Sequence, residues 1–249
     1  MKEDAHVVVR QWSERTLAEA LGREHRDDPV RSGTGGPAGN ARLTAWTGLV
    51  LLVLFAVELG TLLSIGRFLS WHVVVGVLLV PPALLKTATT GWRIVRYYTG
   101  DRAYRQAGPP PTPLRLLGPL VVLFTLAVLG TGLALVFLGP DASRTPLLTV
   151  LGQRVDVLRL HQATFLVWAV VTGLHTLARI VPAVRLTFGA RKTRPRIPGR
   201  VSRAVTLPVT LLAAAIAATL VLGASGAWLA GGLHRPDHHR ASTLSHTAP

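Results

Sequence analysis

The chain contains no cysteine among its 249 residues. Disulfides, iron–sulfur clusters and covalently attached c-type haem all need cysteine sulfur, so the sequence excludes these three features. Haem b is not excluded, because its iron can be held by histidine alone.

Charge of one sign is also scarce: 12 acidic residues stand against 27 lysines and arginines, which gives a net charge of +15. The basic residues form short blocks between long apolar runs, a pattern typical of membrane proteins. A nucleic-acid-binding protein would gather them on one folded face. We therefore expect the lipid bilayer as a partner and no nucleic acid. The first forty residues contain no apolar core of the signal-peptide type.

Five apolar runs are each long enough to cross a bilayer as a helix, which takes about 20 residues. Runs this long and this uniformly apolar are helices, because a helix satisfies its own backbone groups in lipid. We therefore predict an all-α integral membrane protein with five transmembrane helices. Pro81 and Pro82 lie inside the second helix and predict a kink there. The runs are approximately Leu43–Ile65, Trp71–Tyr97, Leu114–Leu138, Val157–Val181 and Val205–Gly231.

The basic residues predict the orientation of these helices. Segments 93–115 and 179–203 are rich in arginine and lysine, whereas the connections 64–70 and 139–159 are poor in net positive charge. Basic loops remain in the cytoplasm, so the N-terminus should be cytoplasmic and the C-terminus extracytoplasmic. The expected organisation is a cytoplasmic polar extension (1–42), a transmembrane domain (43–231) and an extracytoplasmic tail (232–249). The expected location is the inner or plasma membrane.

Three histidines, His72, His161 and His175, fall within the apolar runs or at their ends. Ionisable side chains at membrane depth are costly and often mark a functional site. His161 and His175 are 14 residues apart, which puts both on one side of a helix, separated by about 21 Å along its axis. This spacing is typical of a helix that serves two levels of a haem-binding bundle.

A facing helix is predicted by the second run, which crosses the membrane in the same direction as the fourth. His72 begins the second run, so it should lie at the depth of His161, and we predict that the two ligate one haem b. The position matching His175 is 72 + 14 = 86, which is Lys86. Lysine there leaves several partners open: a haem propionate, an acidic side chain, a quinone carbonyl or iron itself.

Two further features have more than one interpretation. Glu58, in the first run, is a candidate partner for the free nitrogen of His72, or for a serine or threonine on another helix. The tail carries four histidines that could bind a metal or be spaced by chance in a polar segment. They are His234, His238, His239 and His246.

The runs WHVVVGVLLVPPALLKTATTGWRIVRYYTG (Trp71–Gly100), GPPP (Gly108–Pro111) and LHQATFLVWAVVTGLH (Leu160–His175) resemble a group of actinobacterial membrane proteins. These are described as cytochrome b561-like or ferric-reductase-like transmembrane proteins. The likeness covers approximately residues 47–181. It implies a core four-helix cytochrome b-like bundle that moves electrons across or within the membrane. It also implies His72, His161 and His175 as ligands of haem iron, with Lys86 departing from the four-histidine pattern of two haems.

The sequence thus predicts a haem b electron-transfer protein with one haem, a second haem being left open. No segment resembles a flavin or nicotinamide domain, so electrons should come from a quinone or from a partner redox protein, as in a membrane subunit of an oxidoreductase. Two alternatives remain. One is a cofactor-free membrane anchor or scaffold in which the histidines and Lys86 form a polar network. The other is a small proton-coupled transporter that uses Glu58, Lys86 and His175 as a relay.

Overall fold

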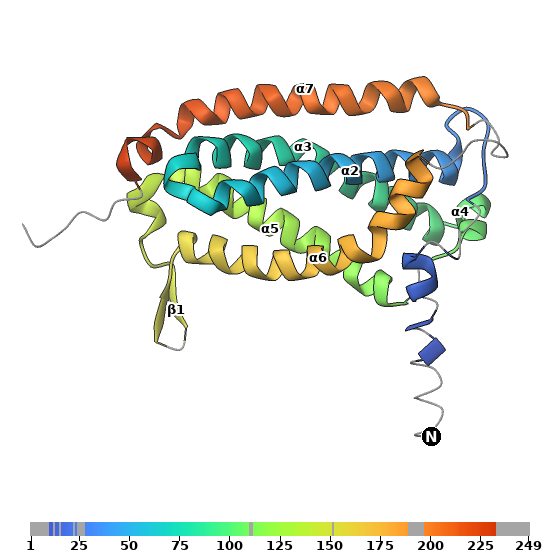
Figure 1. Cartoon of the computed structure of the whole chain (residues 1–249), viewed down its shortest axis with the longest axis horizontal. Coiled ribbons are helices and arrows are strands. Elements are labelled where there is room, and N and C mark those ends of the chain that lie inside the picture. The colour runs from blue at the N-terminus through green and yellow to red at the C-terminus, as the bar shows by residue number, and fades with distance from the viewer. Residues whose placement is uncertain are drawn as a thin grey trace, which may run out of the picture.

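The computed structural model describes residues 10–11, 13–14, 16–21, 23, 28–109, 112–150, 152–188 and 197–232. Helices dominate this part of the chain, as the apolar runs predict (Figure 1). Their order is α2 (Gly36–Thr61), the short 3-10 helix η1 (Leu62–Ser64), α3 (Ile65–Tyr98), α4 (Arg102–Ala107), α5 (Thr112–Ser143), β1 (Leu148–Val150), β2 (Gln153–Val155), α6 (Val157–Phe188), α7 (Arg200–Ala224) and the π-helical turn η2 (Trp228–Gly232).

Four continuous helical stretches in the described residues are long and apolar enough to cross a membrane. The prediction of a multi-pass helical membrane protein is confirmed at this level. The first stretch contains both α2 and α3, joined through η1. The stretches are Gly36–Tyr98, Thr112–Ser143, Val157–Phe188 and Arg200–Ala224.

Within the first stretch, α2 and α3 form an antiparallel pair. The hydroxyl of Thr44, early in α2, donates to the hydroxyl of Thr89, late in α3, at 3.0 Å. At the other end of the pair, Glu58 Oε1 lies 3.0 Å from His72 Nδ1. A single straight helix would hold residues 44 and 89 about 68 Å apart. The chain therefore reverses between them, where Ser64 (φ −153°, ψ 73°) leaves the helical region.

Pro81 and Pro82 lie in a part of α3 that keeps helical dihedral angles, and the kink expected there stays a prediction. Inside α3 the residue with non-helical dihedral angles is Phe68 (φ −107°, ψ 17°), near the turn that follows α2. Pro82 is fully buried. Apolar helices tolerate proline where neighbouring helices support the freed backbone groups. The interruption therefore falls at the reversal of the chain.

Most helix ends differ by several residues from the limits of the apolar runs, and two of these differences have a clear local cause. α2 begins at Gly36, ahead of the apolar run, because Pro37 in the first turn has the φ angle that a helix start needs. α7 ends at Ala224, whereas the fifth run was expected to continue to Gly231. Ser225 ends it by donating its hydroxyl to a carbonyl one turn back, at 2.7 Å, and such side-chain bonds compete with helix continuation.

The helices pack in a closed order. α2 packs on α3, α3 on α5, α5 on α6 and α6 on α2, while α7 packs chiefly against α3 (Figure 1). α3 and α6 therefore face each other across this group. Its buried centre contains Leu51, Leu79 and Ala83, surrounded by Leu54, Phe55 and Leu129.

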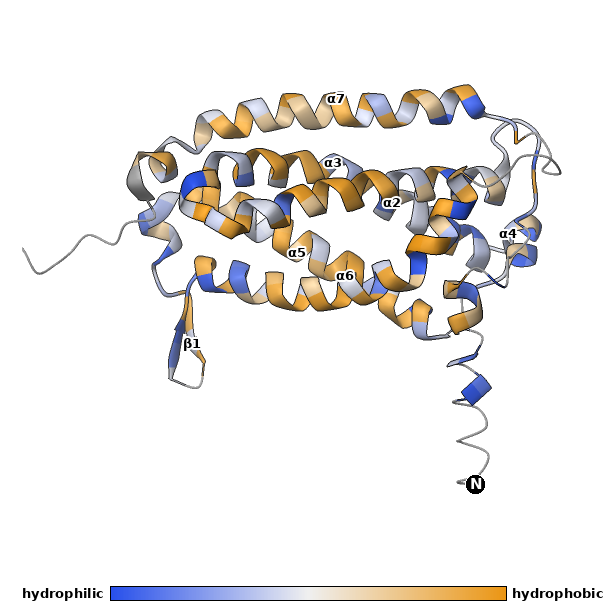
Figure 2. Cartoon of the chain, in the orientation of Figure 1, coloured by the Kyte–Doolittle hydropathy of each residue, from blue (hydrophilic) through white to orange (hydrophobic). Residues whose placement is uncertain are grey.

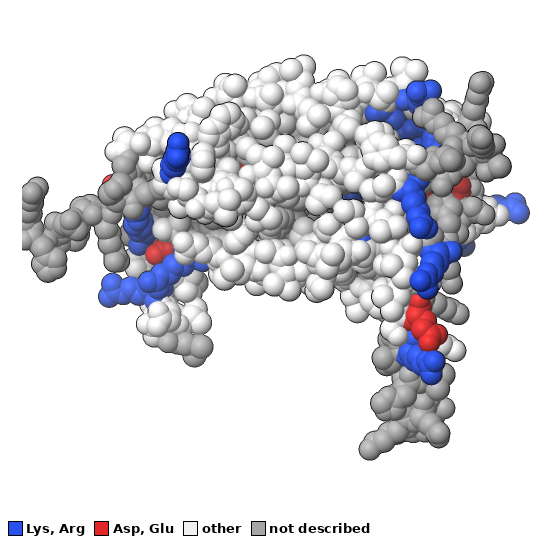
Figure 3. All heavy atoms as spheres, in the orientation of Figure 1, with Lys and Arg blue, Asp and Glu red and all other residues white. Residues whose placement is uncertain are grey.

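The surface separates into an uncharged band and two charged ends. Figure 3 shows lysine, arginine and acidic side chains gathered at both ends of the molecule. Figure 2 shows that the helices between them are largely apolar. Many apolar side chains on these helices face outward, as does Leu177, which is 74% exposed. An exposed apolar band of this kind is compatible with the hydrocarbon core of a bilayer. We call the end with η1, the β1–β2 hairpin and η2 the hairpin end, and the end with α4 and the starts of α2 and α7 the α4 end.

Candidate functional site

Two histidines meet between α3 and α6 towards the hairpin end. His72 belongs to α3 and His161 to the second turn of α6. The centroids of their rings are 6.4 Å apart, and the ring planes cross at 79°. Because α3 and α6 face each other across the group of helices, the two rings meet inside it.

Each ring is held through Nδ1 by a threonine hydroxyl. Thr61 Oγ1 lies 3.0 Å from His72 Nδ1, and Thr131 Oγ1 lies 3.0 Å from His161 Nδ1. Both hydroxyls donate their single proton to a backbone carbonyl about one turn back, at 2.6 Å and 2.7 Å. Each threonine therefore accepts from the histidine, and Nδ1 is the protonated ring nitrogen. The lone pair is on Nε2, and no described residue donates a hydrogen bond to it.

Glu58 reinforces this arrangement at His72. Its Oε1 lies 3.0 Å from His72 Nδ1, while its Oε2 is buried without a hydrogen-bond partner. Gly76 makes room for the carboxyl group, because a Cβ at that position would lie 3.3 Å from Oε1. Of the two partners that the sequence leaves open for Glu58, the described contact of its carboxyl group is with His72. A second acceptor beside Nδ1 again favours the tautomer with its lone pair on Nε2.

Two consecutive residues of α5, Thr131 and Gly132, position the imidazole ring of His161. Thr131 fixes Nδ1 of His161, and the next residue, Gly132, lets the ring approach α5. A Cβ at Gly132 would lie 3.2 Å from His161 Cε1, closer than an ordinary van der Waals contact. One turn of α5 thus provides both the hydrogen bond and the space for this imidazole.

The donor set suits a metal with two axial imidazoles. Two imidazoles that bind one metal from opposite sides, at about 2 Å per bond, have centroids about 6 Å apart. Histidines that ligate a metal donate their other ring nitrogen to a nearby acceptor, as His72 and His161 do. Within the described residues there is no group of three or more histidine, cysteine or acidic side chains that could hold a bare metal ion. Haem iron needs only the two histidines, because the porphyrin provides the remaining ligands.

A second polar level lies towards the α4 end, around Lys86 of α3. Lys86 Nζ donates to the backbone carbonyl of Thr44 on α2 at 3.2 Å. A Cβ at Gly48, one turn further along α2, would lie only 2.9 Å from this Nζ. The glycine therefore lets the ammonium group rest directly on the backbone of α2. None of the described acidic residues forms an ion pair with Lys86.

His175, 14 residues after His161 on α6, contributes to this second level. Its Nδ1 is buried and has no hydrogen-bond partner, and the same holds for Thr172 Oγ1, three residues earlier. His175 lies within electrostatic range of the positive charges of Lys86 and Arg179. Arg179 itself is paired with Glu19 at 2.6 Å. The second level thus brings together the two residues that the sequence spacing matches, but it leaves polar atoms unsatisfied.

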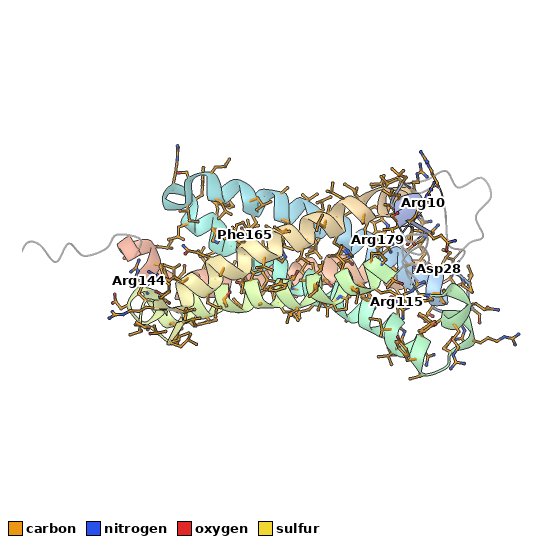
Figure 4. The ribbon with its side chains drawn as sticks, turned by 90° about the horizontal axis from the view of Figure 1, so that it is seen from below. Arg10, Asp28, Arg115, Arg144, Phe165 and Arg179 are labelled. Atoms are coloured by element: carbon orange, nitrogen blue, oxygen red, sulfur yellow. The ribbon has the colours of Figure 1, made fainter. Side chains whose placement is uncertain are left out.

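An aromatic group separates the two levels. Trp168 lies on α6 midway between His161 and His175 in sequence, and it is 6% exposed. Its ring packs against Phe55 at 4.7 Å and against Phe165 at 6.0 Å. Figure 4 shows Phe165 along α6 between the end that bears Arg144 and the end that bears Arg179. These packed rings therefore lie between the polar groups of the two levels.

The α4 end is closed by ion pairs around Asp101, the N-cap of α4. Arg31 and Arg96 approach its carboxylate at 2.8 Å and 3.0 Å. Burial acts to raise the pKa of Asp101, but hydrogen bonds from the α4 backbone and the two guanidinium groups together hold it below its usual value. A further pair, Arg93 with Asp28 at 2.7 Å, lies beside α3. These contacts fix the residues before α2 against the ends of the long helices.

The sequence does not reveal Thr61, Thr131 and Gly132 as part of the site. Threonine is common in apolar helices, and its partner on another helix depends on how the helices pack. A signal exists only for Thr131-Gly132, a hydroxyl next to a residue without a side chain inside an apolar run. The four tail histidines and their proposed metal lie outside the described residues.

No family model, no curated protein and no solved structure matches this chain.

Proposed function

We propose that this protein is a membrane haem b electron-transfer protein in which His72 and His161 are the axial ligands of one haem. The observation that carries the proposal is the pairing of the two imidazoles across the helices: centroids 6.4 Å apart, and each Nδ1 given to a threonine so that Nε2 is free to bind. When bound, haem b supplies a one-electron couple. This proposal agrees with the resemblance to cytochrome b561-like proteins.

The residues of the site have distinct roles in this proposal. His72 and His161 bind the iron. Thr61 and Thr131 orient the two imidazoles, and Glu58 Oε1 gives His72 Nδ1 a second acceptor. The porphyrin would lie in the core four-helix bundle of α2, α3, α5 and α6, with α7 outside it.

The same arrangement supports a topology. We infer that α2 and α3 cross the membrane separately, since hydrogen bonds join the start of one to the end of the other. This gives five crossings. The arginines of segment 93–115, the end of α6 and the start of α7 lie at the α4 end, which favours a cytoplasmic position for that end, and hence for the N-terminus. The hairpin end, with the proposed haem, is then extracytoplasmic, in the inner or plasma membrane.

Electrons would reach the haem from a quinone or a partner redox protein, and the chain would act as a membrane subunit of an oxidoreductase. The two alternatives are less well supported. A relay through Glu58, Lys86 and His175 would have to pass the packed rings around Trp168. A cofactor-free anchor does not account for two histidines that are both held through Nδ1 and whose Nε2 atoms accept no hydrogen bond from the described residues.

The optical spectrum of the purified full-length protein tests the proposal. Protein from haem-replete cells should show a Soret band and, after dithionite, a sharp α band of low-spin haem b. A preparation that is colourless and stays colourless after haem is added would exclude this function.

The topology has its own test, and the absence of native cysteine makes it direct. Thr149→Cys lies in the β1–β2 hairpin, and Arg102→Cys lies at the start of α4. On intact cells an impermeant thiol reagent should label the first variant and not the second, while both should be labelled after the membrane is permeabilised. The reverse pattern would show that the orientation is inverted.

A further inference from the structure

The second polar level contains donors and buried polar atoms that no part of the described chain satisfies. We call Lys86, Thr172 and His175, together with Thr44 and Gly48 of α2, the Lys86 site.

Lys86 is fixed in position but only partly hydrogen-bonded. An ammonium group has three N–H donors, and the described contact of this one is a single bond to Thr44 O at 3.2 Å. Gly48 lets Nζ approach the α2 backbone, where any larger residue would place its Cβ at 2.9 Å from it. The ammonium group is thus anchored on one side and can donate on the other.

The atoms on α6 are similarly unsatisfied. His175 Nδ1 and Thr172 Oγ1 are buried without a partner. Being three residues apart, they lie on one face of α6. Threonine in a helix commonly donates to a carbonyl one turn back, as Thr131 does on α5, but the Thr172 hydroxyl does not. Buried polar groups are seldom left without partners, so a missing partner requires an explanation.

The charge of the site defines what the missing partner must be. Lys86 lies within electrostatic range of Arg179 and His175. Arg179 is neutralised by Glu19 at 2.6 Å, whereas no described carboxylate pairs with Lys86. The site therefore places hydrogen-bond donors and a positive charge at membrane depth. A ligand that binds there should provide acceptor oxygens.

The ligand must be soluble in the bilayer. Leu84 on α3 (51% exposed) and Leu174 and Leu177 on α6 (55% and 74% exposed) flank the site and face outward. Lys86 lies seven residues, or about 10 Å, before Arg93 along α3, below the charged end of the helices. A phosphate or carboxylate headgroup would have to leave the membrane interface to reach it. The level of His72 and His161, where a haem would be held, is about 21 Å away along the axis.

We propose that the Lys86 site binds the head group of a quinone, a neutral ring with two carbonyl oxygens and an apolar tail. Lys86 donates to one carbonyl oxygen, and the Thr172 hydroxyl and the His175 ring complete the hydrogen bonds around the head group. The tail extends past the outward leucines into the lipid. Binding does not require haem; only the exchange of electrons with haem rests on the function proposed above.

Calorimetric titration of the purified full chain with a tail-less dimethylnaphthoquinone tests the site. We expect one binding site per chain. Lys86→Met should weaken binding about tenfold or more, since a bond from a charged donor is lost. Gly48→Ala keeps the lysine but displaces its ammonium group, and it should also weaken binding. The matched control is Gly60→Ala on the same helix, where a Cβ would meet no atom within 4 Å; it should bind normally.

Circular dichroism of each variant verifies that the helices form. Equal affinity in the wild type, Lys86→Met and Gly48→Ala would overturn the proposal. So would a wild type with two haems per chain that falls to one in Lys86→Met, because Lys86 would then be an iron ligand. Titration of His72→Ala separates this inference from the haem proposal: quinone binding should persist there without haem. If the wild type is colourless but still binds quinone through Lys86, the haem proposal is refuted and the quinone-site proposal stands.

Discussion

The two polar levels between α3 and α6 differ in how completely their atoms are hydrogen-bonded. At His72 and His161, each Nδ1 has a threonine partner and only the Nε2 atoms remain available. At Lys86 and His175, an ammonium group keeps unused donors and a ring nitrogen is buried without a partner. A fully supported level suits a permanently bound metal, since its ligands are held in place beforehand. A partly satisfied level suits a ligand that enters and leaves.

The support at the first level can be removed without touching a ligand. The double variant Thr61→Val/Thr131→Val deletes both acceptors of the Nδ1 protons. Loss of such supporting hydrogen bonds typically weakens metal binding by about 10- to 100-fold. Haem retention against a competing haem-binding protein should fall by this order, and the reduction potential of the remaining haem should shift. Thr210→Val, whose hydroxyl bonds only within α7, is the control. Unchanged haem retention in the double variant would show that the threonines do not support the site.

A substitution at Trp168, between the two levels, should have a smaller effect than the threonine double variant. Trp168→Phe keeps an aromatic ring beside Phe55 and loses the bond from Nε1 to Thr125 Oγ1, which is 3.0 Å long. We expect a loss of about 1 kcal/mol in stability, measured by thermal unfolding in detergent, with haem content and quinone binding retained. Trp46→Phe, at a 43% exposed position, should change stability less. Loss of haem in Trp168→Phe would mean that the two levels are coupled through this ring.

The apolar runs predict the long helices well because hydrocarbon requires about 20 apolar residues whatever the neighbouring helices are. Helix ends depend on local contacts that composition does not contain. Pro37 extends α2 backwards, Ser225 ends α7 early, and the non-helical dihedral angles of Ser64 and Phe68 mark the reversal between α2 and α3. These details follow from backbone hydrogen bonds and turn geometry.

The site was predictable where it depends on spacing along one helix. The 14-residue spacing puts His161 and His175 at two levels, and counting the same distance from His72 finds Lys86. The orienting residues, Thr61 and Thr131, come from α2 and α5, and their contacts exist only after the four helices assemble. Gly48 and Gly132 are similar cases, because their role is visible only as the distance to a side chain on another helix.

The haem content of three single variants tests whether His72 and His161 hold one haem between them. The measurement is the pyridine haemochrome of His72→Ala, His161→Ala and His175→Ala, each purified with its haem. If His72 and His161 are the axial ligands of one haem, the first two variants lose it or hold it weakly as a high-spin species, and His175→Ala keeps the wild-type haem content and low-spin spectrum. Wild-type haem content and a low-spin spectrum in both His72→Ala and His161→Ala would contradict the pairing.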